Sequence, residues 1–238
     1  QGILEELPML KAENIVIEPA FKDTAAAIGY GAHYINHYYP DSCMVVLASD
    51  HLIQQPEVFR NILSKAVEEA VEQESIVTLG IKPSFAETGY GYIEVNEKVK
   101  LGEIYPVERF WEKPNKERAE EYVASGNFLW NSGMFIFRTG TILEEIERYM
   151  PRHAAVLQDI ASEIQQGYVK SELAERTAQY FDKFQKISID FGVMERSIKI
   201  KVIPSDFGWN DIGSFSALAD VFEADAKGNV VRSSMLKQ

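Results

Sequence analysis

The chain has 238 residues, of which 46% are hydrophobic and 25% charged, a composition typical of a globular protein that buries a sizeable core. Its formal net charge of −12 argues against a binder of nucleic acid or anionic membranes, which needs a basic face. The lone cysteine, Cys43, excludes an internal disulfide and lies in an apolar run where a buried, inert thiol is expected. No apolar run reaches the length of a membrane span, so we expect a cytoplasmic protein.

The first third of the chain predicts alternating strands and helices. Short apolar runs indicate buried strands at Asn14–Ile17, Met44–Leu47 and Ser75–Gly80. Between them, an Ala-rich segment predicts a helix over Thr24–Tyr38, and an amphipathic segment predicts another over Pro56–Gln73. Such alternation indicates a parallel or mostly parallel sheet with helices on both faces.

The rest of the chain continues as one α/β unit. Further strands are predicted at Gly91–Val95, Pro106–Glu112, Phe128–Phe137 and Lys199–Pro204. Further helices are predicted at Lys116–Ser125, Thr141–Tyr149, Pro151–Gln165, Ser171–Phe181 and from about Ser214. No internal repeat, low-complexity tract or linker interrupts the sequence, so residues 1–238 are expected to form a single domain.

Six segments combine residues in unusual ways. In chain order they are Glu18-Pro19, Asp50-His51, Thr88-Gly-Tyr-Gly-Tyr-Ile-Glu94, Glu112-Lys113-Pro114, Phe128-Leu-Trp-Asn-Ser-Gly-Met-Phe135 and Trp209-Asn-Asp-Ile-Gly213. Taken in that order they resemble the mannose-1-phosphate guanylyltransferases, or GDP-mannose pyrophosphorylases, of the sugar-nucleotide-transferase superfamily. The resemblance runs from about Glu18 to about Ala219. It implies a Rossmann-like, three-layer α/β nucleotidyltransferase domain with a mixed, mostly parallel central sheet.

Two aspartates are candidate metal ligands. Asp50 follows a predicted strand, and ligands of an open α/β sheet bind beyond the carboxyl ends of its strands. Taken alone, Asp50 is equally well explained as the cap of a turn, and Asp211 is better explained as a helix cap. The resemblance implies instead that Asp50 and Asp211 are catalytic carboxylates that bind Mg²⁺ at the nucleotide phosphates, a ligand type that Mg²⁺ prefers.

Two further segments are candidates for holding a sugar phosphate. Alternating Gly and Tyr allow close approach of the backbone to a sugar, although a turn with ordinary tyrosine packing explains them equally simply. Glu112-Lys113 is by itself explained as an exposed salt pair. The resemblance implies that Gly91 and Tyr92 line the hexose pocket, that Glu112 binds sugar hydroxyls, and that Lys113 is a catalytic residue at the phosphate.

The same pocket is expected to include residues from later segments. Asn131 lies in an apolar strand and would need buried partners, which favours a ligand there. The resemblance implies that Asn131 and Gly133 complete the sugar pocket. The segment Ile187–Glu195 also resembles the family, so Asp190 is a candidate for sugar binding, although a structural helix start explains it better physically.

The base is expected to lie near the N-terminal part of the chain. Glu18-Pro19 and the following Lys22–Ala25 resemble the family segment that contacts guanine, which implies that Glu18 and Thr24 bind the base. Asp23 stands where the family usually has Asn, and it can still accept hydrogen bonds from guanine. An ordinary helix N-cap at Asp23 or Thr24 is the structural alternative.

One family segment has no counterpart in this sequence. Family members carry a Gly-rich loop, Gly-x-Gly-x-Arg, whose amides bind the triphosphate, whereas Gln1–Lys11 resembles the stretch just before the Glu-Pro motif. We therefore expect this sequence to be truncated at its N-terminus, starting in mid-domain, and to lack most of the family's C-terminal extension. A sheet without a central strand exposes two backbone edges, so we also expect a homo-oligomer or another covering chain.

The resemblance implies a specific reaction. GMP is transferred from GTP to α-D-mannose 1-phosphate, which gives GDP-mannose and pyrophosphate, with Mg²⁺ as the cofactor. One alternative is a pyrophosphorylase for glucose 1-phosphate with ATP, UTP or dTTP. The other is an inactive, regulatory homologue that binds a sugar nucleotide.

Overall fold

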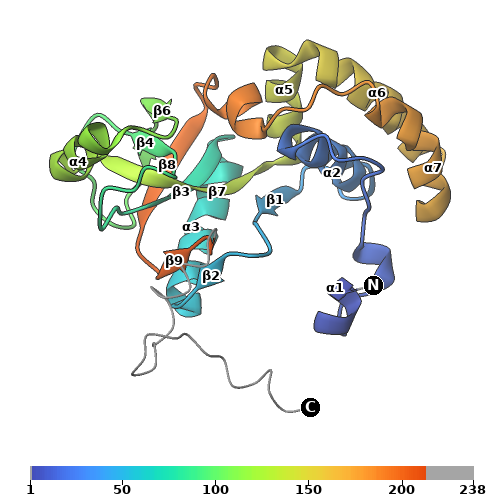
Figure 1. Ribbon diagram of the computed structural model, residues 1–238. Coiled ribbons are helices and arrows are strands. Elements are labelled where there is room, and N and C mark those ends of the chain that lie inside the picture. The colour runs from blue at the N-terminus through green and yellow to red at the C-terminus, as the bar shows by residue number, and fades with distance from the viewer. Residues whose placement is uncertain (1, 213–238) are drawn as a thin grey trace, which may run out of the picture.

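The computed structural model describes residues 2–212, in which a mixed sheet is covered by helices on both faces (Figure 1). Strand order within these residues is β5-β8-β3-β7-β4-β6, and β1 also pairs with β7. The strands of this sheet are β1 (Cys43–Val46), β3 (Ile76–Ile81), β4 (Tyr92–Glu94), β5 (Tyr105–Pro106), β6 (Arg109–Trp111), β7 (Phe128–Arg138) and β8 (Ile200–Ser205). A separate two-stranded sheet pairs β2 (Leu52–Ile53) with β9 (Trp209–Asn210).

Strand directions confirm a mixed α/β sheet. The pairings place β1, β3, β4 and β8 in one direction and β5, β6 and β7 in the other. Only β3 and β8 are neighbours that run parallel within the described sheet, because the long antiparallel β7 lies between β3 and both β1 and β4. The parallel neighbours expected from alternating strands and helices are therefore separated by one inserted strand.

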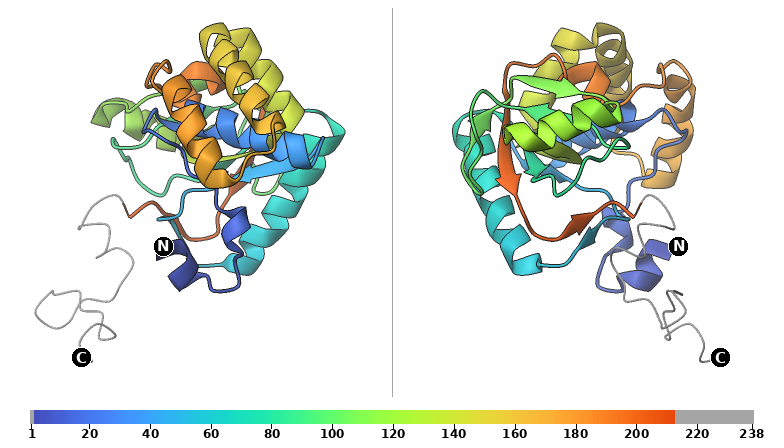
Figure 2. Two further views of the ribbon diagram at one scale, coloured as in Figure 1. Left: turned by 90° about the vertical axis from the view of Figure 1, so that its right-hand side faces the viewer. Right: turned by 60° about the vertical axis from the view of Figure 1, so that its left-hand side comes forward.

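Helices form the outer two of three layers. The described helices are α1 (Gly2–Glu6), α2 (Thr24–Tyr38), α3 (Pro56–Glu72), α4 (Lys116–Ser125), α5 (Thr139–Tyr149), α6 (Pro151–Gln165) and α7 (Lys170–Phe181), with a 3₁₀ turn η1 (Ala12–Asn14) and a π-helical turn η2 (Asp190–Met194). Of these, α1 and η1 contribute to neither apolar core. One apolar core packs α2, α5, α6, α7 and η2 on one face of the sheet. A second packs α3 and α4 on the other face, and Figure 2 shows the two groups of helices on opposite sides. No helix among residues 2–212 is long and apolar enough to cross a membrane.

Most predicted elements are confirmed, three of the helices with the predicted bounds. The predicted strand Asn14–Ile17 is wrong: Asn14 ends η1, and no described strand includes the next three residues. The Ile15 carbonyl accepts a hydrogen bond from Lys170 Nζ (2.9 Å) in place of a strand partner, and Ile17 is 68% exposed. The predicted strand Pro106–Glu112 is divided between β5 and β6. The helix expected from Ser214 lies outside the described residues, and the single-domain prediction stays a prediction.

The central strand β7 carries a bulge that opens the sheet. Between the pairs Thr78–Phe135 and Gly80–Asn131, β3 has one residue whereas β7 has three. The first part of β7 pairs with β4 and its last part with β1, both on the edge opposite β3. Residues 132–134 therefore lie between two partner strands on that edge, where the sheet is open to a ligand.

The close packing of β3 generates a prediction for Gly80. An added Cβ would lie 2.7 Å from both Leu129 Cδ1 and Val202 Cγ2, and 2.9 Å from Leu129 Cβ. Gly80→Ala should therefore lower the free energy of unfolding by about 1–3 kcal/mol, because an overpacked sheet core must shift. Denaturant unfolding of the purified variant measures this loss.

Gly140 provides the matched control, since a Cβ there would meet nothing within 4 Å and the residue lies in α5. Gly140→Ala should raise the free energy of unfolding by about 0.5–1 kcal/mol, because alanine loses less backbone freedom in a helix. Equal effects of the two substitutions would contradict the packing of β3 described above.

Candidate functional site

A cavity of about 310 Å³ opens beside the β7 bulge. Its walls come from the start of α2, the end of β1, the loop before β4, the bulge itself, η2 and β9. The lining residues are Thr24, Ile28, Val46, Ala48, His51, Gly89, Tyr90, Gly91, Asn131, Ser132, Gly133, Phe135, Ile189, Asp190, Trp209 and Asp211. Six of the eleven predicted site residues are among them: Thr24, Gly91, Asn131, Gly133, Asp190 and Asp211.

The Asn-Ser-Gly motif builds the bulge through side chains that replace ladder hydrogen bonds. Ser132 Oγ donates to the Leu79 carbonyl (2.6 Å), and Asn131 Oδ1 accepts from the Gly133 amide (3.1 Å). Gly133 has φ +69°, a left-handed backbone conformation that residues other than glycine rarely adopt. The motif is therefore explained by local backbone chemistry as well as by any ligand.

Asn131 also holds the carboxylate of Asp190, one of the two acidic groups of the cavity. Its Nδ2 donates to Asp190 Oδ1 (2.9 Å). Burial raises the pKa of the Asp190 carboxyl, the hydrogen bond from Asn131 partly offsets this, and the negative charge of Asp23 raises the pKa further. Asn131 is half-buried, and its side-chain partner is thus a carboxylate from η2, 59 residues away in sequence.

The start of α2 is tied to the segment that carries Asp190. Thr24 Oγ1 accepts a hydrogen bond from the Ile189 amide (2.8 Å), and the Ala25 amide donates to the Ile187 carbonyl (3.3 Å). Asp23 has φ +70° and accepts from the Thr24 amide (2.8 Å), so it acts as the helix N-cap. Thr24 therefore lines the cavity with its hydroxyl already engaged in positioning η2.

The small β2–β9 sheet brings together the two segments that carry the predicted metal ligands. Its register pairs Leu52 with Asn210, and continuing it by one residue places His51 opposite Asp211, with Asp50 next along the chain. Trp209 Nε1 donates to His51 Nδ1 (3.1 Å), which adds a side-chain link between the same two segments. Asp211 lines the cavity, whereas Asp50 is exposed beside it, between two lining residues.

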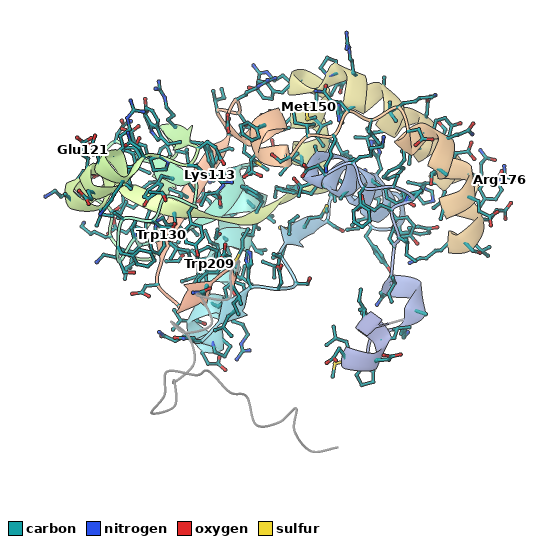
Figure 3. The ribbon with its side chains drawn as sticks, viewed as in Figure 1. Lys113, Glu121, Trp130, Met150, Arg176 and Trp209 are labelled. Atoms are coloured by element: carbon teal, nitrogen blue, oxygen red, sulfur yellow. The ribbon has the colours of Figure 1, made fainter. Side chains whose placement is uncertain are left out.

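Glu112 and Lys113 lie at the rim. A Cβ on Gly91 would lie 3.6 Å from Glu112 Oε2, which places that carboxylate next to the cavity wall. Lys113 Nζ is 3.9 Å from Glu112 Oε1, and both side chains are more than half exposed. Lys113 lies on the sheet side of the molecule together with Trp130 and Trp209, far from Arg176 on the helical side (Figure 3).

Two further predicted residues do not line the cavity. Tyr92 is fully buried in the core between β4 and α4, and its hydroxyl donates to the Glu87 carbonyl (2.8 Å). Its ring therefore stabilises the sheet rather than the ligand pocket. Glu18 is half-buried, and its Oε2 is buried without a hydrogen-bond partner within the described residues, so that burial raises its pKa.

Among the lining residues that sequence reasoning did not assign, three have an aromatic ring with a polar atom: His51, Tyr90 and Trp209. Tyr90 Oη donates to Asp211 Oδ1 (2.8 Å), and its ring packs edge-on against Trp209 with centroids 5.3 Å apart. All three lie inside or beside the quoted motifs. Each stands close to an assigned residue in the same motif, and this proximity was the signal that could have identified it.

The cavity is acidic. Asp190 and Asp211 contribute carboxylates, and no lysine or arginine belongs to its described lining. Among residues 2–212, no group of three or more His, Cys, Asp or Glu side chains is arranged to hold a metal ion. The site can therefore accept hydrogen bonds from a polyol, and it can bind an anionic phosphate only together with a cation.

Fold and cavity together define an α/β protein with a candidate ligand site where the central strands of a mixed sheet separate. The sequence profile of the nucleotidyl transferase family matches residues 4–228, and the chain belongs to this family. It is 39% identical to a mannose-1-phosphate guanylyltransferase of Escherichia coli K12 over 242 residues, which cover 98% of this chain and 50% of that relative.

Two further relatives extend the comparison. The xanthan biosynthesis protein XanB of Xanthomonas campestris pv. campestris (strain ATCC 33913) is 38% identical, over 98% of this chain and 49% of that relative. A crystal structure described as mannose-1-phosphate geranyltransferase from Thermus thermophilus superposes with a TM-score of 0.79 at 31% identity, over 94% of this chain and 62% of that chain. The chain thus spans about half the length of the curated relatives it matches.

The half-buried Asp190 carboxylate generates a prediction on pH. Because its pKa is raised in the folded state, its contribution to stability is greatest at acid pH and is lost as the pH rises through that raised pKa. Asp190→Asn keeps an acceptor for Asn131 and removes the charge. The variant should therefore be at least as stable as the wild type at pH 7, with the difference shrinking on acidification. Urea unfolding between pH 4 and pH 7.5 measures it.

Asn131→Ala tests the same contact from the other side. It leaves the half-buried carboxylate of Asp190 without the donor from Asn131, so the free energy of unfolding at pH 7 should fall by about 1–3 kcal/mol. If Asp190→Asn proves clearly less stable than the wild type at pH 7, the burial of an unfavourable charge at this position is refuted.

Proposed function

We propose that the protein transfers GMP from GTP to α-D-mannose 1-phosphate, which yields GDP-mannose and pyrophosphate. The observation that carries this proposal is the meeting of Asp211 with the Asp50 segment through the β2–β9 pairing, at the mouth of a cavity in a nucleotidyl transferase chain. The names of the relatives from Escherichia coli support the choice of substrates.

A divalent cation fits the acidic groups at this mouth, and Mg²⁺ is the proposed cofactor. Mg²⁺ is usually bound by one or two carboxylates, with waters and substrate phosphates as the remaining ligands, and the chain offers the pair Asp50 and Asp211. When bound, the ion neutralises charge on the transferring phosphate. Asp50 and Asp211 would hold it: Asp50 lies two residues before β2 and Asp211 directly follows β9, so the pairing of these strands holds the two segments together.

The sugar phosphate is proposed to occupy the part of the cavity beside the β7 bulge. Asp190, held by Asn131, presents an acceptor for sugar hydroxyls, and Glu112 presents a second from the rim. Gly91 and Gly133 leave room for the ring because neither carries a side chain. Lys113, exposed at the rim beside Glu112, would pair with the phosphate as a point charge.

The base is proposed to bind near Glu18 and Thr24. The buried Glu18 Oε2 accepts no hydrogen bond from the described residues, so the N–H groups of a guanine would provide its missing donors. Thr24 lies at the start of α2, with its hydroxyl held by the Ile189 amide. Because Glu18 is not part of the cavity lining, the base would extend beyond the sugar site toward this segment.

A substrate panel tests the proposed reaction. The protein that carries this chain is incubated with Mg²⁺, each of the four nucleoside triphosphates, and either mannose 1-phosphate or glucose 1-phosphate, and released pyrophosphate is measured. We expect release with GTP and mannose 1-phosphate. Release only with glucose 1-phosphate and ATP, UTP or dTTP would replace the proposed substrates. Binding of GDP-mannose without turnover would favour an inactive homologue.

The two aspartates provide a second test. Asp50→Asn and Asp211→Asn should each lower kcat by about 100-fold or more, because a charge that stabilises the transition state by several kcal/mol is weakened. Asp159→Asn is the matched control, since Asp159 lies on α6 and pairs at the surface with Lys183. Wild-type turnover in both site variants would remove these residues from the mechanism.

A further inference from the structure

Tyr90 joins two walls of the cavity that are remote in sequence. It lies in the loop before β4, and its hydroxyl donates to Asp211 Oδ1 (2.8 Å), 121 residues away. The ring packs edge-on against Trp130 and Trp209, with centroids 5.3 Å from each. Two indole rings thus restrict the rotation of Tyr90 and direct its hydroxyl at one oxygen of the carboxylate.

The backbone on both sides of Tyr90 is also fixed. The Gly89 amide donates to Glu87 Oε1 (2.7 Å), and the Gly91 carbonyl accepts from the Asn131 amide (2.9 Å) at the bulge. The phenol is therefore held by the main sheet, whereas Asp211 belongs to the end of the small β2–β9 sheet. A change in the position of either sheet would alter the hydrogen bond between Tyr90 and Asp211.

We infer that Tyr90 is a positioning residue that orients the Asp211 carboxylate for a divalent cation. The inference rests on the proposed function, since it deepens the role of Asp211 there. A carboxylate offers about four lone-pair sites, so one phenol donor fixes its plane without blocking cation binding. Hydrogen bonds of this kind, made to a metal-binding group by a neighbour, are typically worth 10–100-fold in metal affinity.

Tyr90→Phe isolates the hydroxyl, because the ring and its contacts with both indoles are retained. The matched control is Tyr105→Phe, which also removes a phenol–carboxylate hydrogen bond: Tyr105 Oη donates to Glu103 Oε2 (2.9 Å) at the opposite edge of the sheet. Mn²⁺ serves as the probe, and its dissociation constant is measured from the signal of the free ion by electron paramagnetic resonance. Thermal unfolding is recorded for each variant.

Tyr90→Phe should weaken Mn²⁺ binding by about 10-fold or more, whereas Tyr105→Phe should leave Mn²⁺ affinity at the wild-type value. The thermal midpoint of Tyr90→Phe should fall no further than that of Tyr105→Phe. A loss of Mn²⁺ affinity in Tyr90→Phe alone then cannot be explained by a loss of stability. The concentration of Mg²⁺ that gives half-maximal pyrophosphate release should rise in Tyr90→Phe by a similar factor.

The outcomes separate this inference from the proposed function. If the wild type binds Mn²⁺ and Asp211→Asn does not, but Tyr90→Phe binds as tightly as the wild type, the positioning role alone is overturned. If wild type and Asp211→Asn bind Mn²⁺ equally, the metal role of Asp211 is overturned as well. An equal loss of affinity in Tyr90→Phe and Tyr105→Phe would mean that general destabilisation, not orientation, weakens the site.

Discussion

The change of partner along one edge of β7 is the constraint on which the rest of the site depends. One end of the strand pairs with β4 and the other with β1, so residues 132–134 have no strand neighbour on that edge. The bulge survives in the middle of a sheet because its own polar groups, from Asn131 to Gly133, satisfy one another and the Leu79 carbonyl. The same residues line the cavity, so the motif can both stabilise the bulge and contact a ligand.

A second, smaller pairing makes the cavity chemically useful. Without β2–β9, Asp211 and the Asp50 loop would be independent segments with no fixed separation. The pairing and the Trp209–His51 hydrogen bond set their relative position, and Tyr90 then ties this unit to the main sheet. Two sheets with different connections thus meet at one carboxylate, and ligand binding there depends on the register of both.

The sequence predicted those features that local chemistry decides. Periodic apolar residues and caps located the helices, and six of the eleven predicted site residues line one cavity, where their ligand roles stay predictions. Tertiary partners decided the rest. Asn14–Ile17 has the composition of a strand, yet a strand requires a hydrogen-bonded neighbour, and Ile15 instead contacts Lys170. Tyr90 and Tyr92 belong to the same apolar core, but Tyr90 precedes β4 and lines the cavity, whereas Tyr92 lies within β4 and is fully buried.

Charge limits how the proposed ligands can bind. Asp190 and Asp211 line the cavity, Glu112 lies at its rim, and the whole chain has a formal net charge of −12. A nucleoside triphosphate adds further negative charge, so its binding is unfavourable unless a cation binds with it. By thermodynamic linkage, cation and nucleotide must then raise one another's affinity by the same factor. A hydrogen bond that orients Asp211 for the cation therefore also strengthens the binding of a nucleotide that it never contacts.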